Sequence, residues 1–197
     1  MLSPFKHVKI NGHFSVVLKK SNQESFEVTG VSEDNIVSRV DKDTLFITVN
    51  PNANTNDGKL TLQYKEMRSL KTEHVNSLSS ENIIDDKNFS LTAIDNKTVR
   101  LDFRSDVLQI ALAGAGSHEF GGKTNSLHLS LDGSGFTDAL KLNCASSNVR
   151  LNGSGKIHFD PGENFMGSVD GDGEIAYKRV PKAQMITHGS DHVKMLN

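Results

Sequence analysis

The amino-acid sequence predicts an all-β fold, a single-stranded right-handed parallel β-helix (solenoid) with irregular N-terminal strands. Three observations favour it. A pattern of alternating apolar residues that ends at Gly-x-Gly returns five times between Leu108 and Met195. The first glycines are Gly114, Gly133, Gly153, Gly171 and Gly189, so the copies lie 19, 20, 18 and 18 residues apart. No segment shows the apolar spacing of a helix. A fixed period with strand-like alternation is typical of a solenoid, in which each repeat buries one side against the next.

The columns of the repeat predict which side chains face the core. Two positions before the first glycine stand Leu112, Leu131, Leu151, Val169 and Thr187, and four positions before it stand Ile110, Leu129, Val149, Gly167 and Met185. Because successive strand residues face opposite sides, these two columns share the inner face. A second short strand follows the glycines at 157–159, 175–177 and 193–195. Equivalent strands of successive coils then pair in parallel, about 4.8 Å apart, and parallel crossovers are right-handed.

The N-terminal half is predicted to contain strands without a clear repeat. Apolar residues fall two apart at 8–10, 14–18, 26–28, 45–49 and 60–64, separated by turn residues and by a longer loop at 51–58. We expect these strands to be antiparallel or to lie at edges. The pattern weakens over 71–90 and returns over 91–103.

The length of 197 residues suits one sizeable core and is short for two ordinary domains. We therefore expect a single β-helical domain over 1–197, with N-terminal strands and less regular coils over 5–104 and regular Gly-x-Gly repeats over 105–197.

Composition and charge exclude several classes of protein. Lys and Arg number 22 against 24 Asp and Glu, without a long basic run, which argues against nucleic acid as a partner. No apolar run is long enough for a transmembrane segment. The first residues lack the apolar core of a signal peptide, so we expect a protein that stays inside the cell or a chain that begins after a removed leader. The single cysteine, Cys144, rules out an internal disulfide and is expected to be a small buried residue.

The spaced runs GAG, DGSG, NGSG and DGDG, together with the opening Phe5–Leu18, resemble the head GIN domain of auto-transporter adhesins, a bacterial family of β-helical envelope proteins. The likeness extends over roughly 5–195. It implies a right-handed parallel β-helix in a secreted, periplasmic or cell-surface protein. It carries no catalytic residues over to this chain. There are also no membrane-barrel strands after the repeats, so self-translocation is not expected.

Candidate binding residues stand directly before the first glycines. In that column Ala113, Asp132, Asn152, Asp170 and His188 follow one another. Asp132, Asn152 and Asp170 would form an outward file of oxygen-bearing side chains that binds calcium or a polar ligand, or they would each cap their own turn.

Other chemistry is not indicated by the sequence. The Gly-x-Gly corners lack the third glycine and the helix of a dinucleotide site, so we assign the glycines to turn geometry. The histidines of the repeat fall in different columns and are expected on the surface, so no metal site, cofactor or catalytic residue is predicted.

Two functions from different classes remain open. The first is a non-catalytic envelope module for adhesion or structure, whose partner is a surface glycan or a protein. The second is a β-helical polysaccharide lyase or hydrolase, for which acidic or basic clusters and aromatic platforms would be needed. Trp is absent and Tyr is limited to Tyr64 and Tyr177, which favours the module. We expect homo-oligomers through the β-helix ends, or a C-terminal end covered by the N-terminal strands.

Overall fold

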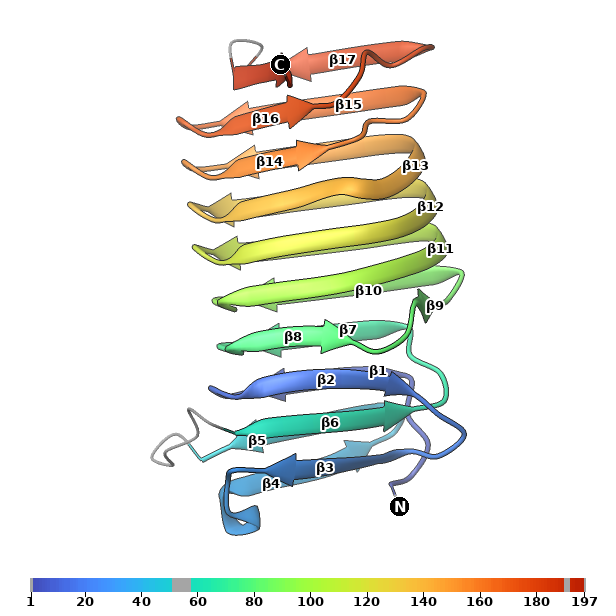
Figure 1. Cartoon of the computed structure of the whole chain (residues 1–197), viewed down its shortest axis with the longest axis vertical. Helices are drawn as coiled ribbons and strands as arrows, with labels where there is room; N and C mark the ends of the chain where they lie inside the picture. Colours follow the sequence, from blue (N-terminus) through green and yellow to red (C-terminus); the bar gives the residue numbers. More distant parts are fainter. Residues whose placement is uncertain (1, 51–57, 190–191, 197) are drawn as a thin grey trace.

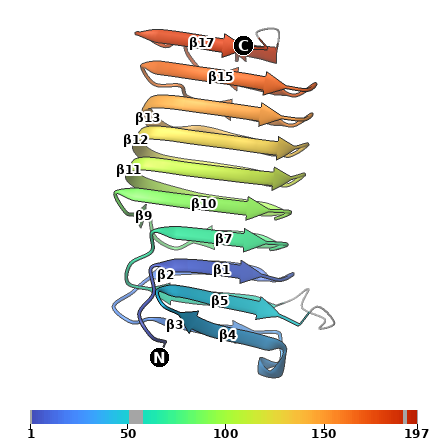
Figure 2. The same ribbon diagram turned by 180° about the vertical axis from the view of Figure 1, so that it is seen from behind.

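The computed structural model describes residues 2–50, 58–189 and 192–196 and shows a parallel β-helix with two sheet faces (Figure 1). Each coil runs along one face, turns, and returns along the other. Face A is in front in Figure 1, and face B is in front in the reverse view of Figure 2. Face A strands run to the right in front and face B strands run to the left behind, while the chain climbs towards its C-terminus. The coil is therefore right-handed, which confirms the predicted fold class.

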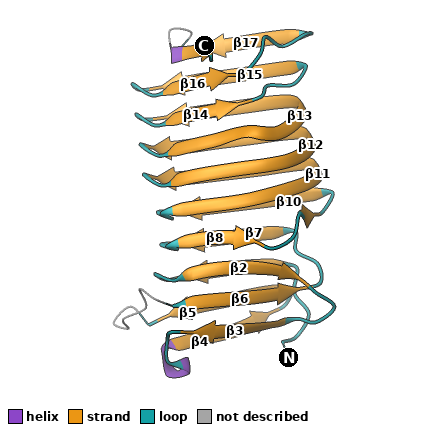
Figure 3. Ribbon diagram, in the orientation of Figure 1, coloured by secondary structure: helices purple, strands orange, loops and turns teal. Residues whose placement is uncertain are grey.

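Short strands make up most of the two faces (Figure 3). Face A contains β2 (Ser15–Lys20), β6 (Lys59–Tyr64), β8 (Ser77–Ser80), β14 (Lys156–Phe159), β16 (Glu174–Tyr177) and β18 (Val193–Met195). Face B contains β1 (His7–Asn11), β5 (Thr44–Val49), β7 (Ser69–Glu73), β10 (Asn88–Ile94), β15 (Asn164–Asp170) and β17 (Gln184–His188).

Three long strands join the faces: β11 (Thr98–Gly114), β12 (Ser117–Gly133) and β13 (Phe136–Asn152). Each begins on face A and ends on face B, and we call the bend between the two halves the far corner. The remaining elements are β3 (Ser25–Thr29), β4 (Ile36–Asp41), β9 (Ile84–Asp85) and the 3-10 turn η1 (Glu33–Asn35). No helix in the described part of the chain is long and apolar enough to span a membrane.

The strand register confirms the predicted inner columns through most of the repeat. Leu112 pairs with Leu131, Leu131 with Leu151, and Leu151 with Val169. The three leucines are at most 2% exposed, and full burial of one such side chain stabilises the fold by about 1.5–3 kcal/mol. Ile110, Leu129 and Val149 fill the neighbouring column.

Aromatic rings extend this core towards the far corner. Their neighbouring centroids lie 4.9–6.0 Å apart in two runs, Phe89–Phe103–Phe120 and Phe159–Phe165–Tyr177.

The last copy departs from the predicted columns by two residues. Thr187 pairs with Gly167 rather than with Val169, and Met185 pairs with Phe165. A shift of two residues keeps Met185 on the inner face, but Met185 is 38% exposed because β17 is the last strand of face B and no further strand of the described chain packs over it. The 20-residue spacing between Gly133 and Gly153 has a different cause. Strand β13 holds one extra residue where its register with β12 shifts between Glu119 and Gly121.

The glycine corner, where face B passes into face A, requires both glycines of the motif. Gly153 has φ +118, a conformation that side chains with a Cβ rarely adopt. Gly155 has no such φ, but a Cβ there would lie 2.7 Å from the carbonyl oxygen of Gly135. This close approach lets the Gly155 amide donate to the Gly133 carbonyl at 2.9 Å. The backbone ladder therefore continues around the corner.

The predicted antiparallel or edge character of the N-terminal strands is wrong for most of them. Strands β1, β5 and β7 pair in parallel on face B, and β2, β6 and β8 do so on face A. The stretch 71–90, predicted to be the least regular, forms β8, β9 and parts of β7 and β10. Within the described ranges, the antiparallel pairs are β3 with β6 and β4 with β5.

The first coil, β1–β2, lies between coils that the chain makes later. It is flanked by β5–β6 on one side and by β7–β8 on the other. The antiparallel strands β3 and β4 close the N-terminal end of the stack (Figures 1 and 2). The expectation that N-terminal strands cover the C-terminal end is therefore wrong, because they lie at the opposite end. The predicted long loop at 51–58 falls almost wholly outside the described residues.

Candidate functional site

A groove of about 530 Å³ lies on face B, and we call it the face B groove. It crosses β10, β11, β12 and β13, and its outward side chains form two rows that follow the strand register. The rows are Ser90, Gln109, His128 and Asn148, and Thr92, Ala111, Ser130 and Arg150. Ala111 and Ser130 are neighbours in the second row, and these small side chains leave the groove open beside Arg150.

The groove is lined by neutral hydrogen-bonding groups and by one cation, Arg150. No carboxylate belongs to its lining. The His128 Nε2 atom lies 3.4 Å from the Ser126 hydroxyl, and Arg150 makes no ion pair with the described residues. A second hollow of about 170 Å³ continues from His128 and Asn148 towards β17. It ends at Met166 and Ile186, which are 46% and 38% exposed.

Face A differs because its charged side chains neutralise one another. Glu119 lies 2.7 Å from the ammonium of Lys141 and 3.6 Å from Arg100. The hydrogen bond from Lys141 lowers the pKa of Glu119. In the same way Lys194, at 2.6 Å, lowers the pKa of Glu174.

The predicted site residues lie at the edge of face B, outside the groove lining. Asp132 pairs with Asn152 and Asn152 with Asp170, so these three form one exposed file as expected. Ala113 continues the file, whereas His188 pairs with Ser168 and does not belong to it. Among the described residues their side chains make no hydrogen bond, so both turn capping and ligand binding by this file stay predictions. No group of three His, Cys, Asp or Glu side chains in that part of the chain could hold a metal ion.

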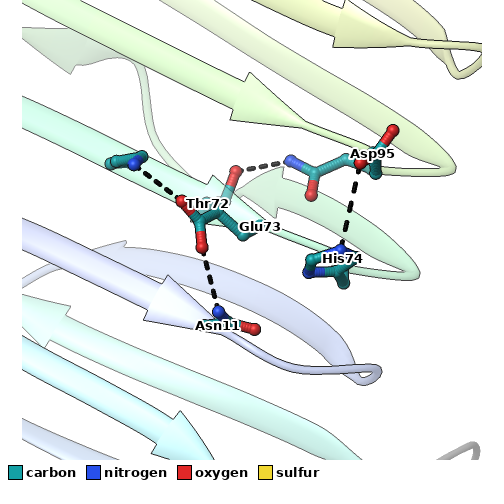
Figure 4. Close-up of polar contacts among 7 residues, drawn as sticks. Asn11, Thr72, Glu73, His74 and Asp95 are labelled. Atoms are coloured by element: carbon teal, nitrogen blue, oxygen red, sulfur yellow. Dashed lines mark hydrogen bonds and ion pairs between the residues drawn. The ribbon is translucent and has the colours of Figure 1, made fainter.

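Nearer the N-terminus the glycine corner is built from other residues (Figure 4). His74 and Asp95 take the positions of the first glycines with φ of 60 and 51, and their side chains lie 3.9 Å apart. The amide of Asn11 donates to Glu73 at 2.9 Å. A stronger hydrogen bond from Lys71 lowers the pKa of Glu73. Beneath this surface Thr72 accepts from the buried Asn96 amide, whose oxygen accepts from the Val75 amide. The polar groups of this network pair with one another and stabilise the corner.

Two predictions about single residues need correction. His118 is 1% exposed, so it belongs to the core and not to the surface. Burial lowers the pKa of His118 to about 4, against which a backbone hydrogen bond with Phe136 acts. Cys144 is half-buried rather than fully buried, and its thiol donates to the Asp160 carbonyl at 3.4 Å. Burial and the nearby Asp160 raise the pKa of Cys144 to about 11, so the thiol is unreactive.

The groove residues were visible in the sequence only as polar residues between apolar columns. The signal that distinguishes them is the pair of small outward residues, Ala111 and Ser130, within rows of larger polar ones. Without the register between coils, no pattern shows that these two positions are neighbours.

Comparisons with known proteins agree with this architecture. The family model described as "Putative auto-transporter adhesin, head GIN domain" matches residues 4–181. No curated protein matches the sequence.

Solved structures show the same fold. A "putative adhesin" from Bacteroides fragilis has a TM-score of 0.85 at 17% identity and covers 99% of this chain and 94% of its own. One from Parabacteroides merdae has a TM-score of 0.77 at 18% identity, covering 100% and 93%. A "putative lipid binding protein" from Parabacteroides distasonis has a TM-score of 0.69 at 18% identity, covering 100% and 94%. With the family model matching most of its length, this chain belongs to the auto-transporter adhesin head GIN domain family.

Proposed function

We propose that the protein is a non-catalytic binding module of the cell envelope that holds a surface glycan in the face B groove. The observation that carries this proposal is the groove of about 530 Å³, lined by hydroxyl, amide and imidazole groups, by the guanidinium of Arg150 and by no carboxylate. Such groups donate to and accept from sugar hydroxyls without the cost of stripping water from paired charges.

The repeat supports an extended ligand. Equivalent side chains recur once per coil, about 4.8 Å apart, so a polymer that lies along the stack meets a similar row of groups at each step. The adjoining hollow with the exposed Met166 and Ile186 adds apolar surface at one end. Apolar contact combined with a few directional hydrogen bonds is the usual composition of a ligand site.

A polysaccharide hydrolase is the weaker alternative. Hydrolysis of a glycosidic bond generally uses two carboxyl groups that face each other across the bond. The face B groove offers none in its lining. Membership of an adhesin family also favours binding over cleavage.

We extend the proposal to the setting of the module. We infer a secreted, periplasmic or cell-surface location from the family, and one β-helical domain over 1–197. Self-association through the C-terminal end, where β17 and β18 are the last strands of their faces, is a further part of the proposal.

The test is binding of the purified protein to an immobilised panel of neutral and acidic polysaccharides. Ala111→Trp fills the groove from an exposed position, and we expect it to abolish the binding that the wild type shows. Ser117→Trp is the matched control, because Ser117 is exposed on face A next to the aromatic Phe136. Binding only to proteins, or retention of glycan binding by Ala111→Trp, would contradict the proposal. New reducing or unsaturated sugar ends would support the enzyme instead.

A further inference from the structure

Another hollow lies at the far corner, separate from the face B groove and from the smaller hollow that adjoins it, and we call it the far-corner hollow. It has a volume of about 240 Å³. Strands β12 and β13 and the loops after β14 and β16 supply its lining, which consists of Lys123, Thr124, Asn125, Asn143, Cys144, Ala145, Gly162, Glu163, Arg179 and Lys182.

Positive charge predominates around this hollow. Lys123, Arg179 and Lys182 line it together with one acidic residue, Glu163. Lys123 and Lys182 are exposed and make no ion pair with the described residues. With the buried Asp160 included, the hollow has three positive and two negative side chains. The two lysines therefore lack the partners that cations on face A have.

The arginine of the hollow forms an ion pair with a buried carboxylate beneath it. The Arg179 Nε atom lies 2.8 Å from the Oδ1 atom of Asp160, which is only 3% exposed. Because the pair lies on the Nε side of a guanidinium that is 56% exposed, its two terminal nitrogens remain as donors in a planar fork that fits an oxyanion. No ion pair of these nitrogens occurs within the described residues.

Beside Arg179, strand β13 and the loop after β14 pack closely and contribute uncharged groups to the floor of the hollow. Gly162 has φ +77, and a Cβ there would lie 2.3 Å from the carbonyl oxygen of Cys144, so the loop after β14 lies directly on β13. Because the pKa of Cys144 is raised to about 11, its thiol stays neutral and does not repel an anion. The amide of Asn143, which also lines the hollow, supplies a neutral donor.

We propose that the far-corner hollow binds an oxyanion, a carboxylate or a sulfate, either as a free ion or as a substituent of an acidic glycan. Arg179 provides the oriented fork, and Lys123 and Lys182 neutralise the charge from two other sides. This site is independent of the proposed function, because a neutral glycan in the face B groove needs none of these residues.

The experiment is a calorimetric titration at low ionic strength with three probes: sodium sulfate, a uronic acid trisaccharide and a neutral trisaccharide. Lys123→Gln/Lys182→Gln removes two exposed charges, and we expect the affinity for the anionic probe to fall about fivefold or more. Glu163→Gln removes the opposing charge and should tighten binding. Lys87→Gln/Lys97→Gln is the matched control, since both lysines are exposed and line no part of the hollow.

The proposal for a free ion is supported if the wild type binds sulfate saturably, Lys123→Gln/Lys182→Gln weakens this binding, Glu163→Gln tightens it and the control variant leaves it unchanged. The same pattern for the uronate alone would assign the anion to a glycan. Absence of saturable binding for both anionic probes, or equal affinities of the site and control double variants, would overturn it. A face B groove that binds no polysaccharide would leave this result unaffected.

Discussion

Acid should destabilise this protein through one buried histidine. His118 lies in an inner column between Val99 and Thr137 and is 1% exposed. Its Nδ1 atom is 3.4 Å from the Thr137 hydroxyl, and its Nε2 atom has no hydrogen-bond partner in the described part of the chain. Protonation would place an unpaired charge in an apolar core. This is why burial lowers the pKa of His118 to about 4.

The sign and the size follow from linkage. The folded-state pKa lies below the unfolded value of about 6.5, so the unfolded chain takes up the proton first. The stabilising effect of a neutral His118 is complete above the unfolded pKa and is lost as the pH falls towards the folded one. With these two values, the free energy of unfolding falls by about 2 kcal/mol at pH 5 and about 3 kcal/mol at pH 4.

The assay compares the wild type with His118→Ile. Ile157 occupies the same column two coils further on, so this side chain suits the site. Urea unfolding, followed by circular dichroism from pH 7 to pH 4, gives the free energy of unfolding of each protein. Contributions of the carboxyl groups are shared and cancel in the difference. We expect the difference to grow in favour of the variant by about 2 kcal/mol between pH 7 and pH 5. If the free energies of unfolding of the two proteins fall in parallel between pH 7 and pH 5, protonation of His118 does not cause the loss of stability.

Three further results test the core, the corner and the polar file. Leu131→Asp buries a carboxylate at a fully buried position and should lower the free energy of unfolding by several kcal/mol. The outward Ser130→Asp should leave the melting temperature almost unchanged. Equal melting temperatures of the two variants would show that the assignment of inward and outward residues is wrong. Gly153→Val should cost about 1–2 kcal/mol or more because φ is +118, and wild-type stability of this variant would contradict the corner geometry. Calcium at millimolar concentration should not raise the melting temperature, since no metal-holding group occurs in the described residues; a rise in wild type that Asp132→Ala/Asp170→Ala abolishes would restore the cation site.

The repeat made the C-terminal coils predictable because its columns follow directly from strand periodicity. Leu112, Leu131 and Leu151 stack as the spacing predicts. The last copy failed because Gly189 resembles the other corner glycines in sequence but stands opposite Val169, so counting from it shifts the register by two residues. Asp191, which stands where the other copies have their second glycine, lies outside the described residues.

The N-terminal coils could not be predicted in the same way. At their corner His74 and Asp95 have positive φ, as the first glycines have in later coils, so the glycine signal is missing although the chain turns at the equivalent position. Pairing order was a second obstacle. Local alternation identifies β1 and β5 as strands, but it does not show that they are parallel neighbours. The face B groove depends on this register between coils, which is why its residues were seen only as outward polar positions.

The insertion of β1–β2 between two later coils divides the molecule into parts of different cooperativity. One edge of this coil is paired only when the chain has made β5 and β6, and the other only when it has made β7 and β8. Backbone hydrogen bonds from Ser21 to Tyr64 and from Arg68 to Lys6 then join the connections between these coils. The N-terminal third must therefore form and melt as one unit. Beyond β10 each coil contacts only its neighbours, so the stack can lose coils singly from β18 backwards. Amide exchange should accordingly be slow and uniform over the first eighty residues or so and should quicken stepwise towards the last coil.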